Sequence, residues 1–162
     1  MRESPVPTPL MSETALDALS LPRRVAAAEL LAEIVRTEHA LAELYDRFAA
    51  GTALPHLRGA LAELAAAKRA HVRMLEPLLG ALHGDARVAA TAGPAPATLD
   101  AAVERRSEAF AQAFQGERAL EVAYRELAGL LGDLSPWPDL PRLAAESARH
   151  RRLLRDLYVR YS

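Results

Sequence analysis

The chain repeats part of its own sequence at a fixed distance. Residues 38–49 read EHALAELYDRFA, and residues 117–128 read ERALEVAYRELA, 79 positions further on. The same offset carries His71 onto His150, so each copy pairs a glutamate with a histidine 33 residues later. Both copies consist mostly of strong helix formers such as alanine, leucine and glutamate. The repeat therefore restricts the fold to two versions of one helical hairpin.

Turn and cap residues divide the chain into four long helices. Prolines, glycines and helix-capping residues predict helices over residues 22–50, 55–79, 98–131 and 140–161. The first two helices are joined by a tight turn and the last two by the segment GDLSPWPD, which gives helical hairpins at 22–80 and 98–161. Such links make the two helices of each hairpin antiparallel neighbours.

The connection between the hairpins is different in kind. Residues 84–97, GDARVAATAGPAPA, are rich in proline, glycine and alanine and lack apolar periodicity, so they indicate a long link that can cross a bundle. We therefore expect one all-α domain over residues 21–162, an up-down four-helix bundle with a long crossover between its second and third helices. Residues 1–20 carry three early prolines and predict a flexible tail.

Composition excludes several classes of function. The 162 residues are 51% hydrophobic and 25% charged, as in soluble globular domains, and the net charge of −1 gives no overall attraction to nucleic acid or anionic lipid. The chain has no cysteine, which excludes disulfides, iron–sulfur clusters and thiol nucleophiles. No apolar run resembles a signal or a membrane-spanning segment. We expect a cytoplasmic protein with no membrane or nucleic-acid partner.

Polar residues interrupt the apolar stripe of every predicted helix. Followed at steps of three and four residues, the stripes are interrupted by Glu38, Lys68, His71, Glu117, Ser147 and His150. In the first hairpin, Glu38 lies about a dozen residues before the turn and Lys68 and His71 about as far beyond it, so a rise of roughly 1.5 Å per residue puts them at one level. The second hairpin repeats the arrangement. The sequence thus predicts one polar layer across an apolar core.

The spacing of glutamate and tyrosine in both copies resembles that of a known superfamily. Each copy places a leucine three residues and a tyrosine seven residues after its glutamate, as in Glu38 with Tyr45 and Glu117 with Tyr124. Over roughly residues 25–160, this chain is similar to ferritin-like and rubrerythrin-like proteins. The resemblance implies a ferritin-like bundle, whose di-iron members bind metal through glutamates and histidines. The positions that it assigns as metal ligands are Glu38, His71, Glu117 and His150.

The two positions that bridge the metals in di-iron members are not matched. Those members carry E-x-x-H on their second and fourth helices, whereas this chain has KRAH and SARH, with Lys68 and Ser147 in place of the glutamates. Glu146 is one residue out of register, turned by about 100° around its helix. Two dications need carboxylates between them, and the Lys68 ammonium opposes that arrangement. We expect a degenerate di-iron site, an ion network in place of metals, no cofactor, and a non-catalytic structural or binding role.

Three alternatives remain open. The same four ligands suit one divalent ion of iron, zinc or manganese in a mononuclear metal-binding or redox protein. A full di-iron oxidase is the second alternative. The third is a helical protein-interaction module, because outer apolar residues permit a homodimer through bundle faces, namely Leu30, Val35, Val122 and Leu130. The arginines of residues 149–160 suit a solvated face and the negative end of a helix dipole, so they do not indicate nucleic-acid binding.

Two further expectations concern residues beside the polar layer. Tyr45 and Tyr124 fall on the helical stripes, so we expect core aromatics and not redox residues. Gly116 directly precedes Glu117, where a glycine costs roughly 1 kcal/mol relative to alanine. A close approach of two helices or a local bulge would explain a glycine at that position.

Overall fold

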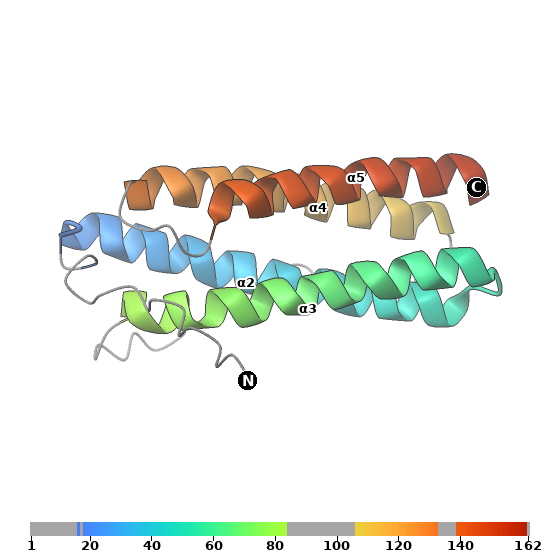
Figure 1. Ribbon diagram of the computed structural model, residues 1–162, viewed down its shortest axis with the longest axis horizontal. Coiled ribbons are helices and arrows are strands. Elements are labelled where there is room, and N and C mark those ends of the chain that lie inside the picture. Colours follow the sequence, from blue (N-terminus) through green and yellow to red (C-terminus); the bar gives the residue numbers. More distant parts are fainter. Residues whose placement is uncertain (1–15, 17, 84–105, 133–138, 162) are drawn as a thin grey trace, which may run out of the picture.

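The described part of the chain consists of four helices and contains no strand. The computed structural model describes residue 16 and residues 18–83, 106–132 and 139–161. Its helices lie side by side (Figure 1) and are α2 (Leu21–Gly51), α3 (Pro55–His83), α4 (Arg106–Leu131) and α5 (Leu140–Tyr161). None of these helices is both long and apolar enough to cross a membrane. Within the described residues, the prediction of an all-α fold with four helices is confirmed.

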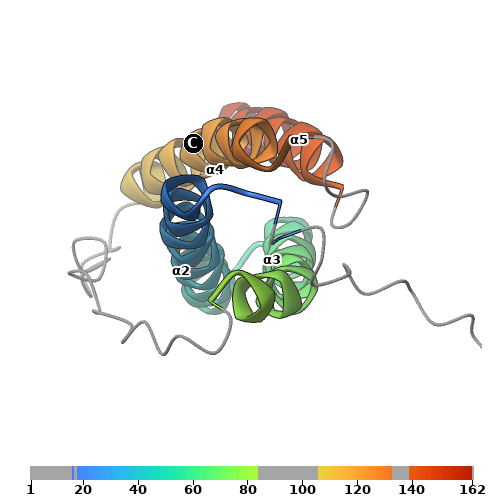
Figure 2. The same cartoon turned by 90° about the vertical axis from the view of Figure 1, so that its left-hand side faces the viewer.

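Neighbouring helices run in opposite directions. Figure 1 shows α2 and α5 running one way and α3 and α4 the other, and the end-on view shows the α2–α3 hairpin against the α4–α5 hairpin (Figure 2). Between the hairpins, contact is extensive at α2–α4 and sparse at α3–α5. The end of α3 and the start of α4 lie at opposite ends of the bundle. The expected crossover at 84–97 lies outside the described residues.

One predicted helix boundary is wrong. The second helix, α3, continues past Pro77 to His83 instead of ending near residue 79. The guanidinium of Arg24, in the first turn of α2, donates to the carbonyls of Ala81 and Leu82 at 3.2 and 3.1 Å. A cation on the last carbonyls of a helix stabilises its end, and this contact lets α3 extend beyond its proline. The expected start of the third helix at residue 98 lies outside the described residues.

The core is built from leucine and alanine, and it reaches further than the sequence predicts. Leu16 and Leu19, which the sequence assigns to a flexible tail, are buried, so the packed part of the chain starts earlier. Val35, expected on the outer surface, is only 9% exposed because α2 packs against both α3 and α4. Leu30 and Leu130 are half-buried. Each fully buried leucine contributes roughly 1.5–3 kcal/mol, which makes this core the main source of stability.

Gly116 lies at a close approach of α4 to α2. A Cβ atom placed on Gly116 would lie 2.7 Å from Leu41 Cδ2 and 3.1 Å from Leu41 Cγ. Non-bonded carbons are most stable at about 3.5–4.0 Å, so the Leu41 side chain would have to move. At Gly59 in α3, by contrast, nothing lies within 4 Å of such an atom. Of the two explanations for Gly116, the structure favours close helix approach.

We expect Gly116→Ala to destabilise the protein by about 1 kcal/mol, because overpacking against Leu41 outweighs the better helix propensity of alanine. In a Leu41→Ala background, the same substitution should become stabilising, since the clash is gone. The matched control Gly59→Ala should stabilise by up to about 1 kcal/mol. Urea unfolding of these variants measures the free energies. A Gly116→Ala protein as stable as Gly59→Ala would contradict the close approach.

Candidate functional site

The six residues of the predicted polar layer come from all four helices, and none is more than 5% exposed. They are Glu38 on α2, Lys68 and His71 on α3, Glu117 on α4, and Ser147 and His150 on α5. Ion-pair contacts bring five of them together. Ser147 Oγ has no hydrogen-bond partner in the described part of the chain.

The ammonium of Lys68 lies between two buried carboxylates. Its Nζ is 3.2 Å from Glu38 Oε2 and 2.8 Å from Glu117 Oε2, so α3 is linked to both α2 and α4. The contact with Glu117 is a hydrogen bond, whereas Glu38 Oε2 makes an ion pair without hydrogen-bond geometry. Burial of three charges is costly unless each has close partners. Here one cation provides a partner for both anions.

Two tyrosines add a hydrogen bond to each carboxylate, and they do so across the repeat. The Tyr45 hydroxyl donates to Glu117 Oε1 at 2.8 Å, and the Tyr124 hydroxyl donates to Glu38 Oε1 at 2.5 Å. Each tyrosine thus bonds to the glutamate of the other copy. Burial, followed by the charge of the bonded carboxylate, raises the pKa of both tyrosines well above 10, so both hydroxyls keep their protons and donate. Both rings are fully buried, as expected of core aromatics.

His71 lies between two carboxylates, one on each side of its ring. Its Nδ1 is 3.1 Å from Glu38 Oε1, and its Nε2 is 2.8 Å from Glu146 Oε2. A neutral imidazole has one N–H and cannot donate to both, whereas the imidazolium donates from both nitrogens. His71 thus joins α3 to α2 through Glu38 and to α5 through Glu146.

Glu146 is the member of the site that the sequence analysis missed. It lies one position off the α5 stripe, yet its side chain reaches inward to His71 and remains 25% exposed. Burial alone would raise the pKa of Glu146, but the hydrogen bond and charge of His71, together with nearby arginines, outweigh it and lower that pKa. The sequence did contain a signal for this contact. Glu146 is adjacent to a core position on its own helix and lies opposite a histidine on another helix.

The α5 side of the layer is held less tightly. His150 Nδ1 lies 3.4 Å from Glu117 Oε1, which is an ion-pair distance but too long for a good hydrogen bond. The rings of His150 and His71 are nearly parallel, with centroids 6.1 Å apart. Burial alone would raise the pKa of Glu117, but the His150 contact and the Lys68 charge outweigh it and lower that pKa. Glu117 is therefore ionised near neutral pH.

The two halves of the layer have the same pattern of contacts. In both Glu38 and Glu117, Oε1 faces a tyrosine hydroxyl and a histidine Nδ1, and Oε2 faces the Lys68 ammonium. Exchange of the two sequence copies converts one set of contacts into the other, except at Lys68. Its counterpart Ser147 has no charge, so the ammonium of Lys68 pairs with the glutamates of both halves.

The residues of this layer, as arranged, do not fit a metal ion. A cation at the centre would have to lie between Glu38 and Glu117, where the Lys68 ammonium already contacts both carboxylates. Carboxylates held by an ammonium and by tyrosine hydroxyls present few free lone pairs to a metal. Within the described ranges, no three aspartate, glutamate or histidine side chains converge as a metal site.

Another buried glutamate lies on α4, outside the polar layer. Glu121 is 7% exposed and pairs with Arg125 at 2.6 Å and with Arg151 at 3.0 Å. The Arg151 guanidinium also lies 5.6 Å from the centre of the Phe114 ring. At least one arginine of the basic segment 149–160 therefore has a structural role in joining α5 to α4.

Comparisons of this chain with protein-family models, curated proteins and solved structures find no match. The comparisons therefore do not link the chain to a ferritin-like superfamily. The geometry of the polar layer has to be interpreted from its own chemistry.

We expect Lys68→Met to destabilise the protein by about 3–5 kcal/mol, because two buried carboxylates lose their shared cation. Adding Glu38→Gln and Glu117→Gln should recover most of the loss, since no unpaired charge then remains. Arg69→Met is the control: Arg69 pairs with Asp46 on the surface, and the cost should stay below about 1 kcal/mol. Urea unfolding followed by circular dichroism gives these values. Equal costs for the two Met variants would refute the assigned role of Lys68.

Stability should fall in acid because folding lowers the pKa of Glu117. A lowered folded pKa gives a stabilising contribution that is present above the unfolded value of about 4.3 and is lost as the pH falls through the folded pKa. We expect Glu117→Gln to show a smaller loss of unfolding free energy than the wild type between about pH 5 and pH 3. The control variant Glu63→Gln, at an exposed position, should lose as much unfolding free energy over this pH range as the wild type. Chemical denaturation across this pH range tests the difference.

Proposed function

We propose that this protein is a non-catalytic, ferritin-like helical bundle in which a lysine-centred ion network takes the place of a di-iron centre, and that its role is structural or binding. The observation that carries the proposal is the position of Lys68 Nζ, within 3.2 Å of one carboxylate and 2.8 Å of the other. The Lys68 ammonium supplies positive charge to both glutamates, which is the task that dications perform in a di-iron protein.

Helix directions support the ferritin-like part of the proposal. The α2 and α4 helices are antiparallel, and α3 ends at the opposite end of the bundle from the start of α4 (Figure 1). A connection between those two points has to travel along the bundle, as a long crossover does. The exchange of tyrosine–glutamate bonds between the two copies also agrees with a pair of related hairpins.

The closed character of the layer supports a role without catalysis. Glu38, Lys68 and Glu117 are fully buried, and every carboxylate oxygen of the two glutamates already faces a cation or a hydroxyl donor. A reacting group needs space beside it for a substrate. The same contacts suit a structural role. A shift of α2 along α4 would separate buried charges from their partners, which is energetically costly.

Iron reconstitution followed by metal analysis tests the proposal. We expect the wild-type protein to retain little metal after gel filtration, because Lys68 occupies the position between the carboxylates. The Lys68→Glu/Ser147→Glu variant restores both bridging carboxylates and should retain more iron. Two iron ions per wild-type chain would refute the proposal. One ion per chain, lost in His71→Ala and in His150→Ala, would instead establish the mononuclear alternative.

A further inference from the structure

A groove of about 440 Å³ runs along the outer side of the α2–α4 pair. Leu30 and Glu33 of α2 line one side, and α4 lines the other with Arg118, Ala119, Val122 and Glu126. Val122, which lines the groove, is 56% exposed. A two-fold interface between copies requires a patch that is complementary to itself.

Charges are placed at opposite ends of this groove. Arg118 and Glu126 stand four residues before and four residues after Val122, so about 12 Å of helix separates them. That separation prevents them from pairing with each other, and neither makes an ion pair within the described residues. Because α2 is antiparallel to α4 and Glu38 meets Tyr124, Glu33 lies toward the Glu126 end. The groove therefore has a basic end and an acidic end.

We propose that the occupant of this groove is a second copy of the chain, with the two α4 helices packed antiparallel around a two-fold axis at Val122. This arrangement puts Arg118 against the partner's Glu126, and Glu126 against the partner's Arg118. Val122 meets the partner's Val122 at the axis. Small side chains at Ala119 and Ala123 allow the helices to approach closely. The same patch serves both subunits, as a two-fold interface requires.

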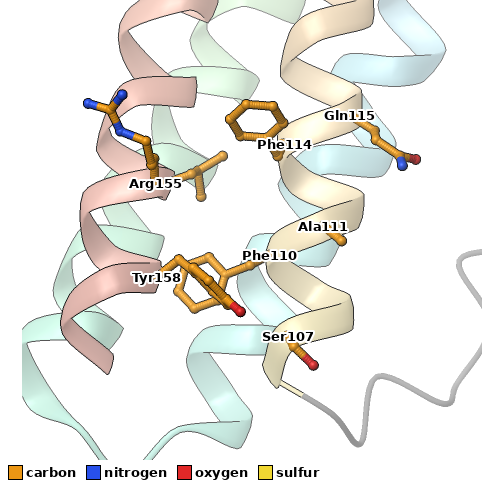
Figure 3. Close-up of a pocket in the computed structure, with 8 residues that line it drawn as sticks. Ser107, Phe110, Ala111, Phe114, Gln115, Arg155 and Tyr158 are labelled. Atoms are coloured by element: carbon orange, nitrogen blue, oxygen red, sulfur yellow. The ribbon is translucent and has the colours of Figure 1, made fainter. Parts of the chain in front are cut away.

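Another groove lacks this self-complementarity. It measures about 380 Å³ and lies between α4 and α5, with the rings of Phe110, Phe114 and Tyr158 along it (Figure 3). Phe110 and Tyr158 pack edge to face, 5.6 Å apart. Arg155 is its one charged lining residue, and Figure 3 shows the Arg155 head group pointing away from the rings. Charge complementarity thus favours the α2–α4 groove as the interface between copies.

This inference goes beyond the proposed function and is independent of it, because none of the groove residues belongs to the lysine network. Metal content and oligomeric state are measured separately. A metal-binding result would refute the network proposal and leave the dimer proposal unaffected. A monomeric protein would refute the dimer proposal and leave the network proposal unaffected.

Cysteine cross-linking tests the two-fold axis directly, because the natural chain has no cysteine. Under mild oxidation, Val122→Cys should give a disulfide-linked dimer, since the two thiols face each other at the axis. Val159→Cys is the control, because Val159 is 76% exposed on α5, away from the groove. Faster and more complete dimer formation by Val122→Cys supports the proposal. Equal cross-linking by the two variants would overturn it.

Charge reversal tests the predicted pairs by sedimentation equilibrium at several concentrations. Arg118→Glu and Glu126→Arg should each weaken the dimer about tenfold or more, and the double variant should restore wild-type association because the pairs reform with opposite sign. Tyr158→Arg, in the other groove, should leave association unchanged, and circular dichroism checks that every variant is folded. A monomeric wild type at all concentrations, or a dimer lost only through Tyr158→Arg, would overturn the proposal.

Discussion

The contact of Lys68 with two buried carboxylates is the interaction on which the polar layer depends. Without a cation between them, the carboxylates of Glu38 and Glu117 would repel each other, and their burial would be costly. Lys68 places a positive charge within 3.2 Å of both carboxylates, and each carboxylate also accepts a hydrogen bond from a tyrosine of the opposite hairpin. The ammonium thereby couples three helices through one atom.

The stability of the fold and the uniqueness of the fold have different origins here. Burial of leucine and alanine supplies most of the favourable free energy, but such contacts have little directional preference and tolerate shifts between similar helices. A buried ion network adds little net free energy, since desolvation offsets its attraction. The network instead favours one alignment of α2, α3 and α4, because any alignment shifted along the helix axes would leave buried charges without partners.

Periodicity in the sequence was sufficient to predict the helices and the faces on which Glu38, Lys68 and His71 lie. It did not predict how far a side chain reaches, and for that reason Glu146 was placed outside the layer although its carboxylate bonds His71. The donor role of the tyrosines also depends on the packing of one hairpin against the other. The length of α3 escaped prediction for a similar reason, because Arg24 of another helix completes its end.

The unequal contacts between the hairpins have a mechanical consequence. Close packing at Gly116 and Leu41 makes the α2–α4 side stiff, whereas the α3–α5 side is joined by fewer contacts, among them the bond from His71 to Glu146. Local opening of a protein follows the side with the fewest buried contacts. Thermal fluctuation should therefore rotate one hairpin away from the other about the α2–α4 line. Water would then enter first beside His71, and the lysine would be the last part of the layer to be wetted.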